Sequence, residues 1–173
     1  MKILIRPETT ADFVAIHELN KTAFGQDNEA RLVDLLRQSD AFIPGLSLVA
    51  MMDDIIVGHI LFTKIKIKDE QGNVFESLAL APMAVQPALQ KRGIGGQLIR
   101  SGLAEAKTLG YQSVIVLGHE HYYPKFGFVP AEKWQIKAPF DVPSNVFMGI
   151  ELVKDGLKGI SGTVEYPKEF EAV

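Results

Sequence analysis

The chain has 173 residues, 47% of them hydrophobic, and a formal net charge of −3. At this length one domain can bury roughly 70% of its unfolded surface, so the core needs no disulfide or metal. Cysteine is absent, which excludes disulfides, a thiolate nucleophile and Cys-ligated zinc or iron–sulfur sites.

The sequence indicates neither a targeting signal nor a surface for a membrane or a nucleic acid. The apolar run at residues 3–5 is too short for a signal-peptide core. Apolar stretches elsewhere are of strand length, far below the roughly 20 residues of a membrane span. The mildly acidic charge offers no positive field for a phosphate backbone. We therefore expect a cytoplasmic protein with no membrane and no nucleic-acid partner.

Two helices are predicted before the main sheet. Thr9-Thr10-Ala11-Asp12 has the pattern of a capping box, and apolar residues follow at helical spacing as far as Phe24. Gly25 is expected to end this helix. Asp27 or Asn28 can cap a second helix, which stops before Pro44-Gly45.

Three strands are predicted next. Residues 47–52 form an apolar strand, and Asp53-Asp54 makes a turn into a long strand over residues 55–68. The second half of that strand alternates lysine with isoleucine, which predicts one exposed face. Gln71-Gly72-Asn73 closes a hairpin, and the strand returns over residues 74–85 with a kink expected at Pro82.

The rest of the chain completes an α/β domain with a mixed sheet. Residues 95–109 read as a helix with an apolar face that includes Leu109, and residues 113–117 as a buried strand parallel to the preceding one. Residues 129–152 read as a closing hairpin. We assign residues 1–153 to a single domain and residues 154–173 to an extension packed on it, with a strand at 163–166.

A basic, glycine-rich loop, Gln90-Lys91-Arg92-Gly93-Ile94-Gly95-Gly96, opens the long helix. Glycines let backbone N–H groups approach an anion, and the helix N-terminus and two cations add positive charge. The loop therefore suits a pyrophosphate, although glycines can also serve turn geometry alone. It lacks the Gly-Lys-Ser/Thr of a Walker motif and the three-glycine dinucleotide fingerprint.

These residues resemble the acyl-CoA motif Gln/Arg-x-x-Gly-x-Gly/Ala of the GNAT superfamily of N-acetyltransferases. The likeness extends to Met83-Ala84-Val85 before the motif and to Tyr123-Pro124-Lys125-Phe126-Gly127-Phe128 after it, and covers residues 3–152. The doubled tyrosine at 122–123 resembles a bacterial subgroup of predicted acetyltransferases with mostly unassigned acceptors.

The resemblance implies the acyl-CoA N-acyltransferase fold, a central mixed and splayed sheet flanked by helices. It implies acetyl-CoA as co-substrate, with its pantetheine on backbone groups of the splayed strand and its pyrophosphate on the loop. The acceptor would be an amine of a small molecule or peptide, attacking the thioester directly in a ternary complex. The residues expected to bind the cofactor are Met83, Ala84, Val85, Gln90, Lys91, Arg92, Gly93, Ile94, Gly95, Gly96 and Tyr123.

Catalytic roles follow from the two proton transfers of this reaction. An amine with a pKa near 10 must lose a proton, and a leaving thiolate with a pKa near 8.5 gains one. Tyr123 is expected to be the acid, with packing among Phe126 and Phe128 as its alternative role. Glu29 is the candidate base; Glu18, His59 or a water chain could replace it.

Histidines give two further candidates for contact with the substrate. His59 shares a strand face with apolar residues, so it is a substrate contact or a core histidine. His119 follows the buried strand and could touch substrate or cofactor. His119 and His121 face one side of an extended chain, but no third ligand cluster is visible, so no metal is expected.

Other interpretations remain open at this point. The cofactor site could belong to a non-catalytic acyl-CoA-binding or sensing domain, because binding needs only the loop and the splayed strand. Acyl transfer to a hydroxyl is a third reading. The chain could be a monomer or a homodimer, with the extension covering the acceptor pocket or bridging two copies.

Overall fold

The computed structural model describes residues 2–173 and falls into two compact units. The first unit contains the chain up to Thr63, Ala81–Glu105 and Lys168–Val173. The second contains Lys64–Leu80 and Ala106–Pro167. The predicted domain boundary after residue 153 stays a prediction.

Antiparallel strands form the sheet of the first unit. β1 (Leu4–Pro7) pairs with β2 (Phe42–Met52), which pairs with the first part of β3 (Ile55–Lys68) through a turn at Asp53-Asp54. The strand predicted over 47–52 thus begins earlier, at Phe42. The register between Phe42 and Ser47 is irregular, which accommodates a proline and a glycine within the strand.

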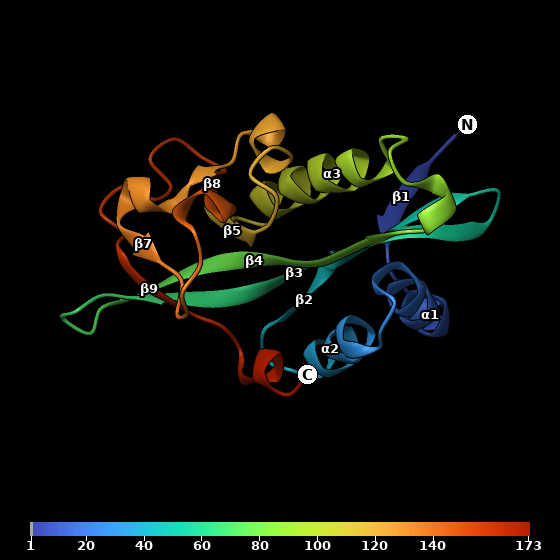
Figure 1. Ribbon diagram of the computed structural model, residues 1–173, viewed down its shortest axis with the longest axis horizontal. Helices are drawn as coiled ribbons and strands as arrows, with labels where there is room; N and C mark the ends of the chain where they lie inside the picture. Colours follow the sequence, from blue (N-terminus) through green and yellow to red (C-terminus); the bar gives the residue numbers. More distant parts are fainter. Residues whose placement is uncertain (1) are drawn as a thin grey trace. The chain divides into compact units, whose positions relative to one another are not determined.

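Two helices bury one face each in the core of this unit. α1 (Phe13–Phe24) and α2 (Asn28–Arg37) lie side by side (Figure 1). The predicted capping box at Thr9 is present, and Gly25 ends α1 with a φ of 68°. The buried cluster consists of Ile16, Leu19, Leu32, Val33, Leu36, Val49, Ile56, Leu61 and Ala84, with Phe170 and Val173 packed against it.

The second unit joins parallel and antiparallel strands. The first part of β4 (Val74–Val85) runs parallel to β5 (Ser113–Leu117), which pairs antiparallel with β8 (Phe147–Glu151). β8 pairs with β6 (Val129–Pro130), so the predicted closing hairpin is confirmed. The β4–β5 ladder has the register pairs Leu78↔Val114 and Ala79↔Ile115, and none beyond them among residues 2–173. The Ala81–Pro82 peptide bond that follows is cis.

The C-terminal residues add a strand to the second unit. β9 (Gly162–Glu165) pairs antiparallel with the second part of β3 and parallel with β7 (Ile136–Lys137). The buried cluster here consists of Ile65, Ile67, Ala79, Ile115, Ala131, Ile136, Phe147, Leu157 and Val164. Lys66 and Lys68 are exposed on β3, which confirms the predicted alternation.

α3 (Ile94–Thr108) follows β4 along the chain. It starts and ends one residue before the predicted bounds, so Leu109 lies outside it and is 46% exposed instead of buried. The physical reason is the turn at its end, where Gly110 has a φ of 96° and Tyr111 N donates to Ala106 O. None of the helices within residues 2–173 has the length and apolar composition to cross a membrane.

Candidate active site

The end of β4 is tied to its neighbours immediately before the glycine-rich loop. Gln86 N donates to Val57 O at 2.9 Å, and Gln86 Nε2 donates to Ile56 O at 3.4 Å. Gln90, the first residue of the motif, donates from Nε2 to Val85 O at 3.2 Å. The loop therefore starts from a fixed point at the end of the strand.

The loop has backbone features that suit the predicted binding of an anion. Lys91 and Gly93 have φ values of 64° and 85°, and Lys91, Arg92 and Gly93 are exposed. Gly93 O accepts the first α-helical bond, from Gln97 N at 3.1 Å, so the N–H groups of Ile94–Gly96 have no partner within the helix. No acidic residue lies in the first turn. Helix N–H groups without a partner in the helix, the helix dipole and two exposed cations are thus adjacent in the chain.

Two glycines let the helix that carries this loop lie close to the sheet. A Cβ added at Gly58 of β3 would lie 2.9 Å from Leu98 Cδ1 and 3.2 Å from Ile94 Cγ2. A Cβ added at Gly102 of α3 would overlap the Phe62 ring. Ile94 and Phe62 are almost fully buried. Glycine is therefore needed for space at Gly102, and at Gly58 an added Cβ would require Leu98 and Ile94 to shift by a few tenths of an ångström.

The residues predicted to hold pantetheine, Met83, Ala84 and Val85, carry apolar side chains. Ala84 lies in the buried cluster of the first unit, whereas Met83 and Val85 are half-buried. All three belong to the part of β4 that follows the last register pair with β5. The predicted pairing of pantetheine with the main chain of this segment requires no polar side chain at these positions.

Tyr123 stands in an aromatic cluster of the second unit. It begins the short helix Tyr123–Phe126, and its ring contacts the edges of Tyr122 at a centroid distance of 5.2 Å and Phe128 at 5.7 Å. Burial, with a smaller contribution from Tyr122, raises the pKa of Tyr123 to about 12. The phenol therefore keeps its proton at neutral pH, which suits a proton donor and not a base.

The candidate bases Glu29 and Glu18 lie on helices of the first unit. Glu29 is half-buried in the first turn of α2, where it accepts a hydrogen bond from Gln26 Nε2 at 3.0 Å. A carboxylate here also stabilises the helix N-terminus. Glu18 is exposed on α1. No contact of either residue identifies it as a base.

His59 is fully buried within a hydrogen-bonded chain. Its Nε2 lies 2.9 Å from Ser47 Oγ, which donates to Glu8 Oε1, and Arg37 Nε binds the other oxygen of Glu8 at 2.8 Å. Asn20 Nδ2 lies 3.4 Å from His59 Nδ1. Both ring nitrogens thus have partners, which favours the core role over contact with a substrate.

This buried histidine predicts an acid-sensitive fold. Burial, and secondarily Arg37, lowers the pKa of His59 to about 3. In the unfolded chain His59 binds a proton near pH 6.5. As the pH is lowered below 6.5, the free energy of unfolding should therefore decrease, by up to about 1.4 kcal/mol per pH unit. In urea titrations between pH 4.5 and 7, His59→Gln should lose this slope. His121→Gln is the control, because the His121 side chain is 93% exposed; equal slopes in both variants would contradict the assignment.

His119 and its neighbours lie on the surface of the second unit. His119 is exposed, and its carbonyl accepts Tyr122 N at 3.1 Å, which starts the turn into Tyr123. His121 pairs with Glu120 at 3.6 Å. Among residues 2–173, no group of three or more His, Asp or Glu side chains is arranged to hold a metal ion.

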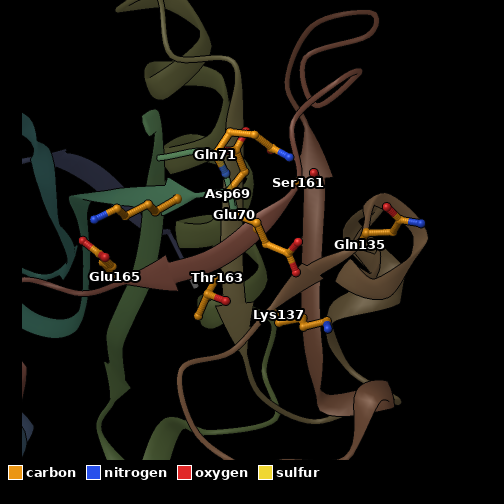
Figure 2. A pocket seen from close by; sticks show the side chains of 10 residues that line it. Asp69, Glu70, Gln71, Gln135, Lys137, Ser161, Thr163 and Glu165 are labelled. Atoms are coloured by element: carbon orange, nitrogen blue, oxygen red, sulfur yellow. Dashed lines mark hydrogen bonds between the residues drawn. The ribbon is translucent and has the colours of Figure 1, made fainter. Parts of the chain in front are cut away.

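The second unit also contains a polar groove of about 660 Å³ that no sequence motif indicated (Figure 2). It lies between the β3–β4 turn and the β7–β9 pair, and carries charges of both signs. The Asp69 carboxylate is engaged within its own turn, by Gln71 N and Asn73 N. The groove is lined by Lys68, Asp69, Glu70, Gln71, Gln135, Lys137, Ser161, Gly162, Thr163 and Glu165, none of them a predicted site residue.

Comparison with known proteins finds a family whose matched region includes both the glycine-rich loop and Tyr123. A model of the acetyltransferase (GNAT) domain matches residues 4–131, a span that includes both. The Escherichia coli K12 protein named as the uncharacterized N-acetyltransferase YjhQ is 42% identical over 134 residues, or 77% of this chain and 74% of that protein.

Two solved structures are similar over nearly the whole chain. The E. coli GNAT-family N-acetyltransferase YhbS, in complex with CoA, has a TM-score of 0.90 at 31% identity, covering 99% of this chain and 93% of that one. A GNAT-family acetyltransferase from Brucella melitensis, in complex with acetyl-CoA, has a TM-score of 0.78 at 31% identity, covering 98% of both chains. The predicted fold class is confirmed, and the chain belongs to the GNAT family of N-acetyltransferases.

Proposed function

We propose that the chain transfers an acetyl group from acetyl-CoA to an amine of a small molecule or peptide. The observation that carries this proposal is the loop at residues 90–96, where the first backbone N–H groups of α3 have no partner within the helix and two exposed cations, Lys91 and Arg92, precede them in the chain. Two similar structures, of YhbS and of the B. melitensis protein, contain CoA and acetyl-CoA respectively.

The loop would bind the pyrophosphate of the cofactor. N–H groups at Ile94–Gly96 would donate to phosphate oxygens, and Lys91 and Arg92 would add charge attraction. Pantetheine would lie along Met83–Val85, whose main chain would pair with its amides and polarise the thioester carbonyl. Because the main chain would make these contacts, the apolar side chains present at Met83–Val85 are sufficient for pantetheine to bind.

The chemistry is a direct displacement at the thioester. The neutral amine nitrogen attacks the carbonyl carbon, the resulting tetrahedral intermediate collapses, and the carbon–sulfur bond breaks. Tyr123 gives its proton to the leaving sulfur, while the new amide nitrogen loses a proton to a base or to water. The high pKa of Tyr123 keeps its hydroxyl protonated throughout the physiological range, as a proton donor requires, and also makes the phenol a weaker acid than an exposed tyrosine.

A non-catalytic acyl-CoA sensor is the second candidate. The observation that favours it is the environment of the candidate bases, because His59 is sealed in the core and Glu29 bonds to Gln26. Release of free CoA thiol in the presence of a panel of amines separates the two functions. The enzyme should release thiol in proportion to one acceptor class; a sensor should release none beyond background hydrolysis.

Binding by the loop should depend on salt if its cations contribute. Raising NaCl from 50 to 500 mM should weaken acetyl-CoA binding by about tenfold, because screening shortens the reach of exposed charges. The double variant Lys91→Gln/Arg92→Gln should bind more weakly and lose most of this dependence. Lys154→Gln/Lys158→Gln removes the same charge from exposed positions elsewhere and serves as the control. A salt-independent affinity in the parent protein would assign binding to the backbone alone.

A further inference from the structure

Gly118 lies against the ring of Tyr123 without room for a side chain. It follows β5 directly, and its N–H donates to Val146 O at 2.9 Å, which fixes its backbone. A Cβ added at this position would overlap Tyr123 Cε2 and lie 2.9 Å from Cδ2 and 3.3 Å from Cζ. The Cδ2–Cε2 edge of the phenol ring therefore lies against the Gly118 backbone.

The need for glycine here is spatial and not conformational. The glycines with positive φ in the described chain include Gly110 and Gly127 but not Gly118. No left-handed backbone therefore requires glycine here, and the three atoms nearest to an added Cβ all belong to the Tyr123 ring. Contacts this short essentially never occur at real Cβ atoms, and the ring would have to move.

The surroundings of the ring determine what such a movement would change. Tyr122 and Phe128 contact the Tyr123 ring edge-to-face, and Phe128 is 1% exposed and cannot yield. The backbone of Tyr123 is itself held by a bond from its N to His119 O at 3.4 Å. With its backbone and one flank fixed, the ring moves away from an added Cβ by swinging about its Cα–Cβ bond, which displaces the hydroxyl at its far end; a turn about the ring's own long axis would leave the hydroxyl oxygen in place.

We propose that Gly118 is a positioning residue for acetyl transfer: by lacking a side chain it forms the slot that seats the Tyr123 ring and sets the place of its hydroxyl. The inference rests on the proposed role of Tyr123 as the acid. Displacing a reacting group by about 1 Å costs up to about 100-fold in rate. Gly118 itself touches neither the reacting atoms nor, in this proposal, the cofactor pyrophosphate.

The test compares Gly118→Ala with the parent protein by three readouts. We expect kcat to fall at least about tenfold, while the Kd for acetyl-CoA stays within about twofold of the parent value. In spectra of ring-labelled tyrosine, assigned with Tyr123→Phe, the Tyr123 signals should shift while those of Tyr166 do not. In a Tyr123→Ala background the ring is gone, so adding Gly118→Ala should lower kcat no further.

Gly149→Ala is the matched control for adding a methyl group. Gly149 is a buried glycine of the same unit, and its added Cβ would lie 3.1 Å from Ile115 Cδ1 and 3.3 Å from Trp134 Cζ3, away from Tyr123. It should leave both kcat and the Tyr123 signals unchanged. An equal loss of kcat in both variants would mean that an added methyl group lowers kcat by disturbing the packing of the unit wherever it is placed. This result would overturn the proposal.

The remaining outcomes separate this inference from the proposed function. If Tyr123→Phe loses turnover but Gly118→Ala neither loses turnover nor moves the Tyr123 signals, the inference about Gly118 is wrong and the acid stands. If Tyr123→Phe retains full turnover, the acid role is wrong and the catalytic part of the inference falls with it. The spectra then decide separately whether Gly118 seats the ring.

Discussion

Gly93→Val is expected to weaken acetyl-CoA binding at least about 100-fold, or about 2.7 kcal/mol. Gly93 has a φ of 85° and no atom within 4 Å of an added Cβ, so the valine side chain would project into the open space proposed for the pyrophosphate. The substitution also strains the backbone that directs the N–H groups toward the ligand. Isothermal titration with acetyl-CoA measures the change, with circular dichroism to establish that the variant is folded.

Gly72→Val provides a control with nearly the same local geometry. Gly72 has a φ of 86° and open space around its added Cβ, but it lies in the β3–β4 turn of the second unit. Its replacement costs similar backbone strain and should leave acetyl-CoA affinity unchanged. A similar loss of affinity in both variants, or in neither, would remove the argument that the glycine-rich loop holds the cofactor.

Tyr123→Phe is expected to lower kcat by about 100- to 1000-fold with the Kd for acetyl-CoA unchanged, since it removes the proposed proton donor and keeps the ring. The sign of the pH dependence follows from the raised pKa. Because the pKa of Tyr123 is about 12, its proton is retained and kcat should not decline through loss of this acid at any pH below about 11. Steady-state rates of thiol release from pH 6 to 10 measure both effects.

Tyr166→Phe is the matched control for loss of a buried tyrosine hydroxyl. Burial raises the pKa of Tyr166 to about 12 as well, and its ring stacks on Phe140 at a centroid distance of 6.3 Å. We expect kcat and Kd close to those of the parent protein. Undiminished turnover in Tyr123→Phe would show that sulfur leaves without this acid and would refute the role.

The parts of the fold that depend on local signals could be predicted from the sequence. Gly25 and Gly110 end helices because they adopt positive φ values, and the alternation at Lys66 and Lys68 reports one exposed strand face. The glycine-rich loop was found for the same reason: its residue types, spacing and place before a helix lie within seven consecutive residues.

Features that depend on distant segments could not be predicted in the same way. The core role of His59 depends on Ser47 of β2, Glu8 in the segment after β1 and Asn20 of α1, which meet only in the folded unit. The constraint at Gly118 is equally invisible in sequence, because nothing in the spacing shows that a ring five residues later folds back onto it. The base of the proposed reaction stays a prediction.

Isothermal titration of the purified protein with acetyl-CoA tests the central claim most directly, with desulfo-CoA and ATP as comparison ligands. Saturable binding of about one equivalent of acetyl-CoA and of desulfo-CoA is expected, because both carry the pyrophosphate and pantetheine that the loop and β4 would hold. ATP lacks pantetheine and should not reproduce it. Absence of binding to a demonstrably folded sample would contradict the account and leave the glycine-rich loop with a structural role only.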